Sequence, residues 1–473
     1  MFNSTSSLLT ALAQLLGARA VLTDADDCAP YFKGARYGDG SALAVLRPDT
    51  HEQVVEIVRL CAEHSQAIVL QGANTGLVAA STPDASGRLM VLSLDRLKRH
   101  IEIDAVNRSV TVDAGVSLQD LNEALAPHGL FFPIDLGANP SIGGMIAANT
   151  GGARLIKYGD VRQNLLGLRA VLMQPAGQEL NLLSALRKNN TGPDLKQLFV
   201  GSSGAYGIMT RAVLQVHRLP KQSATALVVP RDQAAVLELL QVLERDCGEF
   251  LSAFEGISGA ALQAVLQHIP GISNPFAPEG VPEYCVLVEL NSTSDPALSG
   301  IDLDSLLMSC LENLFGDVVE NAVIGRAEDL WRIRHAISEA LRHQGKMIAF
   351  DISMPRSRMA QFRDAGLALI ADNYPWMRVM DFGHWGDGGC HFNMVWPASA
   401  SIAYSSDVAQ EIRTRIYDLV VNEFEGSFSA EHGVGPYNLD FYRRYTSDAA
   451  RQLSGGIQNL LDPHSLLGLT RFS

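Results

Sequence analysis

Two glycine-rich segments in the C-terminal half of the chain carry side chains that could bind a metal ion and move a proton. Residues 383–393 read GHWGDGGCHFN, and residues 429–435 read SAEHGVG. Two imidazoles and one carboxylate, from His384, His391 and Glu431, make a divalent-ion set that leaves a position open for a substrate. Zn²⁺ is the commonest occupant of such a set, but ferrous iron uses similar ligands, so the residue types leave the metal open. His432 lies outside this set and is then free to act as a base.

These side chains need elements that bring them together. Residues 379–384 and 390–396 read as two strands joined by a Gly-Asp-Gly-Gly turn, so the two imidazoles can meet across a hairpin. His391 and Asn393 are two residues apart on one strand and therefore face the same side. Each histidine taken singly is more often structural, so the prediction of a metal site depends on the combination.

A third polar pair lies on a predicted helix at residues 328–344. The helix is indicated by apolar residues at helical spacing, Leu330, Ile333, Ile337 and Leu341. Arg334 and Ser338 are four residues apart and share a face, where a guanidinium beside a hydroxyl suits a carboxylate.

Backbone dominates a second kind of candidate site. The turn at residues 71–76, QGANTG, follows a predicted buried strand at residues 67–70 and can present successive N–H groups to a pyrophosphate. Residues 133–152 supply a second, glycine-dense surface. No G-x-G-x-x-G follows a strand and no G-x-x-x-x-G-K-[ST] occurs, which argues against a nicotinamide Rossmann site and a P-loop. One extended ligand lying along both surfaces explains them together.

The composition sets the frame for these sites. A chain of 473 residues, 47% of them hydrophobic, predicts two or three packed domains. Its 37 Lys and Arg against 51 Asp and Glu give a net charge of −14, which disfavours nucleic acid and anionic membrane surfaces as partners. The six cysteines form no CxxC pair, which favours a reduced, cytoplasmic location. The apolar residues 6–16 predict an amphipathic helix, and no run is long enough for an integral membrane segment.

Short elements alternate along residues 42–113 and predict a mixed α/β unit. Thr50 and Ser117 are each predicted to begin a helix. Glycine becomes rarer and the elements longer from Ser223 onward, which places a domain boundary at residues 218–222. Helical patterns at residues 407–424 and 447–461 close the chain.

Taken in order, these segments resemble the FAD-linked D-2-hydroxyacid dehydrogenases, the group that contains D-2-hydroxyglutarate and D-lactate dehydrogenases. That group belongs to the vanillyl-alcohol-oxidase type of flavoprotein. The likeness extends over most of the chain, through residues 46–48 (LRP), 71–77, 142–152, 158–162 (YGDVR), 198–210, the Gly-Asp-Gly hairpin and 431–433 (EHG).

The resemblance implies an α+β, two-domain FAD-binding fold of the vanillyl-alcohol-oxidase type. It implies a FAD-binding domain at residues 1–219, an antiparallel-sheet cap domain for the substrate at 220–424, and a C-terminal segment at 425–473 that returns to the FAD domain. No His or Cys occurs in the 71–77 turn, so noncovalent FAD is expected. The residues that the resemblance assigns to the flavin are Gln71, Gly72, Ala73, Asn74, Thr75, Gly76, Leu77, Pro133, Asp135, Ser141, Gly143, Gly144, Ala148, Asn149, Gly152, Gly204, Gly207 and Ile208.

The resemblance also implies a reaction, the oxidation of a D-2-hydroxy acid to the 2-oxo acid. The metal on the His384, His391 and Glu431 set would take the substrate hydroxyl and lower its pKa, while Arg334 and Ser338 hold a carboxylate. His432 would remove the hydroxyl proton as the Cα hydride moves to flavin N5, and Asn393 would be a further polar contact. Without a nicotinamide motif, the expected electron acceptor is an electron-transfer flavoprotein or a quinone. A homodimer stays an open expectation.

Three positions depart from the family pattern. Ala349 stands where the 2-hydroxyglutarate enzymes carry a lysine fifteen residues after the helix arginine, and Lys346 is near it in sequence. Ser203 replaces a usual Glu, and residues 466–471, LLGLTR, replace Asn-Pro-Gly-Lys. D-2-hydroxyglutarate therefore leads only slightly over D-lactate or glycolate. Two rivals stay open: a flavin oxidase of sugars or alcohols with structural histidines, and a noncatalytic flavin-binding subunit of a glycolate-oxidase-like complex.

Overall fold

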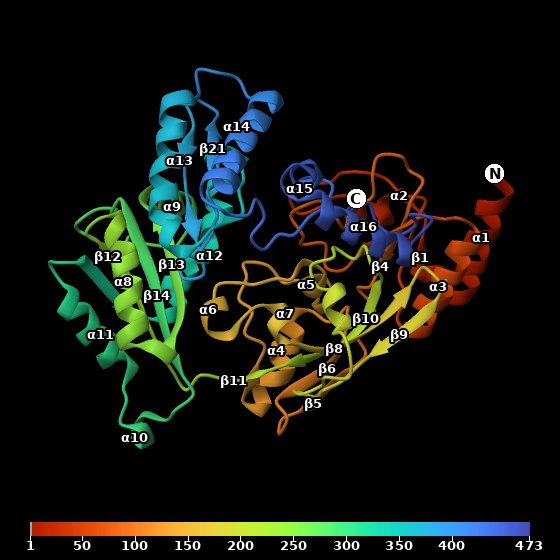
Figure 1. Cartoon of the computed structure of the whole chain (residues 1–473), viewed down its shortest axis with the longest axis horizontal. Coiled ribbons are helices and arrows are strands. Elements are labelled where there is room, and N and C mark those ends of the chain that lie inside the picture. The colour runs from red at the N-terminus through yellow and green to blue at the C-terminus, as the bar shows by residue number, and fades with distance from the viewer. Residues whose placement is uncertain (1) are drawn as a thin grey trace.

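The computed structural model describes residues 2–473, which form two lobes (Figure 1). The first lobe holds the N-terminal elements as far as β11 (His217–Arg218), and the cap lobe begins with β12 (Gln222–Pro230). Within the described residues, no helix has the length and apolar character needed to cross a membrane.

Two sheets build the first lobe. The smaller has the order β1-β2-β4-β3, in which β2, β4 and β3 run parallel, and the larger is antiparallel with the order β5-β6-β10-β8-β9. The strands of the smaller sheet are β1 (Val21–Leu22), β2 (Ala44–Leu46), β3 (Ile68–Gln71) and β4 (Met90–Ser93). Those of the larger sheet are β5 (Ile101–Asp104), β6 (Ser109–Asp113), β8 (Leu165–Leu172), β9 (Gln178–Leu182) and β10 (Ile208–Gln215). The short β7 (Leu130–Phe131) pairs with β11.

Side-chain caps start the helices of this lobe where the sequence predicts them. The Thr50 hydroxyl accepts from the Gln53 N–H at the start of α3, and the Ser117 hydroxyl accepts from Asp120 at the start of α4. Both predictions are confirmed. The helices of this lobe are α1 (Phe2–Leu16), α2 (Ala25–Phe32), α3 (His51–Glu63), α4 (Leu118–Leu125), α5 (Ile142–Ala148), α6 (Leu155–Tyr158) and α7 (Val161–Asn164).

The cap lobe is organised by a five-stranded antiparallel sheet with the order β15-β12-β14-β13-β19. Successive residues of a strand face opposite sides, so β12 feeds two cores. Ala226 and Val228 pack with α8 and α11, whereas Leu227 and Val229 pack with α9 and α12. The elements are β13 (Leu251–Ser258), β14 (Tyr284–Ser292), β15 (Val319–Gly325), β19 (Phe382–Gly383), α8 (Gln233–Asp246), α9 (Gly259–His268), α10 (Pro296–Ser299), α11 (Leu303–Leu314) and α12 (Ala327–Arg342).

The predicted hairpin is present but is more broken than its sequence suggests. Phe382 pairs with His391, and Val379 pairs with Met394, so the two arms are antiparallel. Gly383 has a φ of +134°, and the Asn393 N–H bonds within its own arm to the His391 carbonyl. These irregularities divide the arms among neighbouring sheets, because β19 pairs with β13 and β20 pairs with β17. The remaining cap elements are β16 (Gly345–Ile348), β17 (Ile352–Ser353), β18 (Arg378–Val379), β20 (Gly389–Cys390), β21 (Met394–Pro397), α13 (Met359–Asn373) and α14 (Ser406–Asp418).

The end of the chain packs on the first lobe. Leu467 forms a parallel bridge with Ile68 of β3, and the Tyr206 hydroxyl donates to the Ser454 carbonyl. Helices α15 (Leu439–Tyr445) and α16 (Asp448–Leu461) precede this bridge and lie above the first lobe in Figure 1. The segment before α15 therefore runs from the cap lobe to the first lobe, and it carries the EHG residues.

Candidate active site

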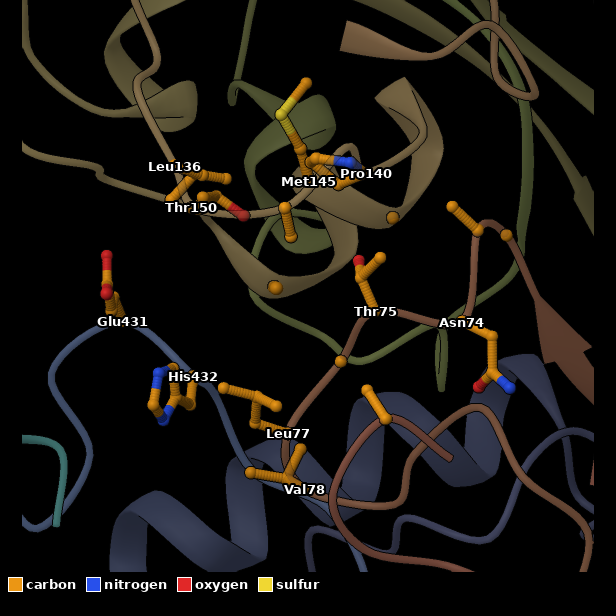
Figure 2. A pocket seen from close by; sticks show the side chains of 18 of the residues that line it. Asn74, Thr75, Leu77, Val78, Leu136, Pro140, Met145, Thr150, Glu431 and His432 are labelled. Carbon is orange, nitrogen blue, oxygen red and sulfur yellow. The ribbon is translucent and has the colours of Figure 1, made fainter. Parts of the chain in front are cut away.

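A cavity of about 670 Å³ is lined by residues of the first lobe, the cap lobe and the C-terminal segment. The turn after β3 and the residues around α5 face each other across it (Figure 2). Glu431 and His432 lie at one side of this view, with Leu77 and Val78 next to His432, while Asn74 lies farther away (Figure 2). The cavity thus has a backbone-rich part and a part rich in ionisable side chains.

Most residues assigned to the flavin line this cavity. They are Gln71, Gly72, Ala73, Asn74, Thr75, Gly76, Leu77, Asp135, Ser141, Gly143, Gly144, Ala148 and Gly204. Pro133, Asn149, Gly152, Gly207 and Ile208 do not line it. Ile208 is buried in a hydrophobic core, and the Asn149 side chain is held by Asp160 and the Arg162 N–H.

Two side chains of the 71–77 turn form hydrogen bonds that stabilise the turn, and the turn lines the cavity. The Gln71 amide donates to the Tyr31 and Ser81 carbonyls, and the Asn74 amide donates to the Lys33 carbonyl. A Cβ on Gly72 would lie 2.2 Å from the Ser141 hydroxyl oxygen, so only glycine allows the turn to approach α5 so closely. Backbone and small side chains facing a long cavity fit an elongated ligand such as a dinucleotide.

The predicted metal ligands converge in the same cavity. The Glu431 Oε1 atom lies 3.6 Å from His384 Nε2 and 3.5 Å from His391 Nε2. The His384 Nε2 atom is buried and has no hydrogen-bond partner in the described residues. Two ring nitrogens that each lie within 3.6 Å of one carboxylate oxygen, with one of these nitrogens unsatisfied, fit a divalent cation.

Glu255, a residue that the sequence reasoning missed, fixes the orientation of His384. Its side chain is 1% exposed and accepts from His384 Nδ1 at 2.9 Å and from Arg334 Nε at 2.7 Å. A carboxylate on the far nitrogen of a histidine fixes the tautomer in which the near nitrogen is a ligand. The available signal was a lone Glu inside the otherwise uncharged segment LSAFEGIS, which forms the buried strand β13.

Asp351, also missed from sequence, holds the loop that carries Glu431 and His432. Its Oδ2 atom accepts from three successive N–H groups, those of residues 430, 431 and 432, at 3.1, 3.0 and 2.8 Å. The four residues Asp351, His391, Glu431 and His432 each offer a ligand atom within 4.8 Å of the others, and this group does not contain the predicted ligand His384. The three hydrogen bonds occupy Oδ2 of Asp351 and leave its Oδ1 atom, whereas His384 Nε2 is buried without a partner, which supports His384 as a ligand.

The electrostatics of this cluster are uneven. Burial raises the pKa of Glu431, but His384 and the neighbouring histidines outweigh it and hold that pKa well below its ordinary value. Burial lowers the pKa of His384, yet Glu255 and Glu431 raise it well above the ordinary value. Burial and the His384 charge lower the pKa of His391 well below the ordinary value. A neutral His391 and an ionised Glu431 are the protonation states that metal ligands need, whereas His384, whose pKa is raised, must lose its Nε2 proton before that nitrogen can bind a metal.

The predicted substrate contacts line the cavity as well. Arg334 Nε is bound by Glu255, and the guanidinium lies over the Phe382 ring at 4.7 Å. Its terminal amino groups make no protein hydrogen bond within the described residues, and Ser338 lies on the same helix face. Asn393 accepts the Phe350 N–H through its side-chain oxygen, which orients the amide. His432 Nδ1 lies 3.4 Å from Asp351 Oδ2.

The positions that depart from the family pattern have clear places. Ala349 is buried, and Lys346 extends over the Tyr404 ring at 4.1 Å, away from the large cavity. The Ser203 hydroxyl donates to the Val434 carbonyl and so ties the first lobe to the C-terminal segment. Residues 466–471 do not line the cavity.

Comparison with known proteins gives matches along most of the chain. Residues 42–182 match the FAD binding domain family, and residues 219–468 match the family of FAD linked oxidases, C-terminal domain. The chain is 35% identical to "Probable D-2-hydroxyglutarate dehydrogenase, mitochondrial" of Oryza sativa subsp. indica, over 90% of this chain and 74% of that protein. It is 33% identical to D-2-hydroxyglutarate dehydrogenase of Xanthomonas citri pv. viticola, over 98% and 96% of the two chains. The solved structure of 4-ethylphenol oxidase from Gulosibacter chungangensis superposes with a TM-score of 0.75 at 18% identity, over 99% of this chain and 96% of that chain.

The fold and the matches confirm an FAD-dependent oxidoreductase with the two-domain vanillyl-alcohol-oxidase architecture. Within that class, the chain belongs to the FAD-linked oxidases of the D-2-hydroxyglutarate dehydrogenase group. The expected family and fold class are thereby confirmed.

Proposed function

We propose that the protein oxidises a D-2-hydroxy acid, with D-2-hydroxyglutarate favoured, to the 2-oxo acid in a metal-dependent reaction. The observation that carries the proposal is a single cavity that joins the 71–77 turn to the His384, His391, Glu431 and His432 cluster. FAD bound noncovalently along the turn supplies a two-electron acceptor. A divalent cation, most often Zn²⁺ for these ligands, supplies Lewis acidity toward a hydroxyl.

The side chains of the protein then have separate tasks. Arg334 and Ser338 hold a substrate carboxylate, because they share one face of α12 at the cavity. His432 accepts the hydroxyl proton, and Asp351, 3.4 Å from its Nδ1, leaves the opposite ring nitrogen for that transfer. Asn393 provides a fixed amide at the same wall of the cavity.

The test is anaerobic reduction of the bound flavin, followed by absorbance. The wild-type protein should bleach with D-2-hydroxyglutarate and not with the L-enantiomer. His432→Ala should keep its flavin and lose at least about two orders of magnitude in the rate of bleaching, the usual range for a general base. A wild-type rate in this variant would remove His432 from the mechanism.

Further experiments distinguish the proposed function from the two alternative functions. Unchanged turnover after complete metal removal would favour a metal-independent oxidase of sugars or alcohols. Bleaching by the purified single chain would exclude a noncatalytic subunit. D-lactate is the second candidate substrate, and the observation that favours it is Ala349 in place of the family lysine. We expect the reduced enzyme to pass electrons to an electron-transfer flavoprotein or a quinone, and each can be supplied as the acceptor.

A further inference from the structure

Three arginine side chains line the large cavity, and two of them lack a counter-ion. Arg334 is paired with Glu255. Arg36 and Arg342 form no ion pair anywhere in the described part of the chain. Glu339 lies on α12 one turn before Arg342, yet the two side chains are not within ion-pair distance. Unneutralised positive charge in a cavity of an acidic protein is a binding feature for an anion.

The Arg36 side chain has an unsatisfied hydrogen-bond donor. The residue is partly exposed, but its Nε atom is buried and has no hydrogen-bond partner. Arg36 and Arg342 come from different lobes and line the same cavity. Burial lowers the pKa of Arg36, and the charge of Arg342 lowers it further. Tyr37 and Tyr437, with rings stacked at 3.4 Å, and Asp351 are the other ionisable groups that act on Arg36. An anion between the two arginines would relieve both the repulsion and the unmet hydrogen bond.

Arg342 extends the row of substrate-binding groups on α12. Arg334, Ser338 and Arg342 follow at intervals of four residues, so all three lie on one helix face toward the cavity. The Cα atoms of the two arginines are about 12 Å apart along the axis, and both side chains can reach back toward one molecule. A carboxylate at the inner arginine and a second anionic group at the outer one would fit this row.

The cation that the family places elsewhere is missing here. Ala349 is buried and carries no charge, and Lys346 lies over Tyr404 outside the large cavity. The arginine pair is therefore the available source of positive charge for a second acidic group.

We propose that Arg36 and Arg342 form a subsite that binds the distal carboxylate of a dianionic 2-hydroxy acid. This proposal rests on the function proposed above, and it assigns to two residues a selectivity that Ala349 does not provide. Two guanidinium groups around one carboxylate would let a chain without the lysine select a diacid.

The test uses two substrates that differ only at the far end, D-2-hydroxyglutarate and D-2-hydroxyvalerate. The variants are Arg36→Lys, Arg36→Gln and Arg342→Gln. Arg332→Gln is the matched control, because Arg332 is also on α12 but binds the Pro270 and Gly271 carbonyls and does not line the cavity. Stopped-flow flavin reduction gives kcat/KM for each substrate.

Each Gln variant should lower the ratio of diacid to monoacid kcat/KM by roughly 10- to 100-fold, as expected for a lost charge-assisted hydrogen bond. Arg36→Lys should restore part of that ratio, and Arg332→Gln should leave it within twofold. Because Arg342 is exposed, its replacement by Gln should leave the protein folded. An unchanged ratio in Arg342→Gln would overturn the proposal. Equal losses for both substrates, or loss of FAD, would show that the arginines serve the flavin and would also overturn it.

The failure of the two proposals is distinguishable. If no D-2-hydroxy acid reduces the wild-type flavin, the proposed function fails. If both acids reduce it and the variants keep the wild-type preference, only the subsite fails.

Discussion

Replacement of Glu255 by Gln tests whether a carboxylate behind His384 sets the metal affinity. Gln keeps the size of the side chain but loses the charge and one acceptor. In the structure both oxygens of Glu255 accept from charged or polar donors, His384 Nδ1 and Arg334 Nε. The amide NH₂ of Gln must face one of these donors, which leaves a buried hydrogen bond unmade.

The expected loss in metal affinity is about 10- to 100-fold, the usual effect of removing such a partner from a metal-bound histidine. That loss corresponds to about 1.4–2.8 kcal/mol at 25 °C. Burial supports the upper part of the range, because Glu255 is 1% exposed and water cannot replace its charge.

The assay is metal titration of chelator-treated, FAD-loaded protein, with the metal content and the rate of flavin reduction as readouts. Glu289→Gln is the matched control. Glu289 lies on β14 beside β13, is also 1% exposed and accepts from Arg154 and Trp331, but it touches no predicted ligand. Both variants should have a lower free energy of unfolding. Only Glu255→Gln should require a higher metal concentration for half-maximal binding. Equal metal affinity in the two variants would refute the reasoning.

Three more substitutions test other contacts. Asp351→Asn should slow flavin reduction about 10-fold or more with FAD retained, because it weakens three hydrogen bonds to the loop that carries His432; a wild-type rate in stopped flow would contradict this. Gly72→Ala should weaken FAD binding because its Cβ would lie 2.2 Å from the Ser141 hydroxyl oxygen, and adding Ser141→Ala should recover part of the affinity in a fluorescence titration. Burial and nearby arginines lower the pKa of His217 from 6.5 to about 4, so only the unfolded chain binds this proton between those pH values. Stability should therefore fall as the pH drops through that window, and His217→Gln should reduce the difference in Tm between pH 7.5 and pH 5.

The sequence was most informative where function depends on local order along the chain. Residues 71–77 and residues 431–433 are each a continuous stretch of sequence. The composition of the first indicates close approach of the backbone, and that of the second indicates acid-base chemistry. Helix starts at Thr50 and Ser117 were readable because a cap is made within three residues of the chain. The sequence predicts a hairpin with two continuous arms. In the structure the arms are irregular and pair with strands of different sheets, β13 and β17, and this pairing depends on residues that are distant in the sequence.

The carboxylates that orient the predicted ligands, Glu255 and Asp351, cannot be predicted from local sequence patterns. Glu255 reaches His384 across 129 positions of the chain, and Asp351 reaches the 430–432 loop across about 80. No local pattern encodes such a pairing, because it is created when separate strands pack side by side. The same holds for Arg36 and Arg342, which come from the first lobe and the cap and line one cavity.

The sequence by itself determined the family, the fold class and the kinds of chemical group available, because these follow from residue types and short spacings. Tertiary structure alone decided which nitrogen of His384 faces Glu431, which carboxylates are held by other donors, and which arginines lack a partner. The physical reason is that hydrogen bonding, burial and charge are set by what surrounds a side chain, and most of that surrounding comes from distant parts of the chain.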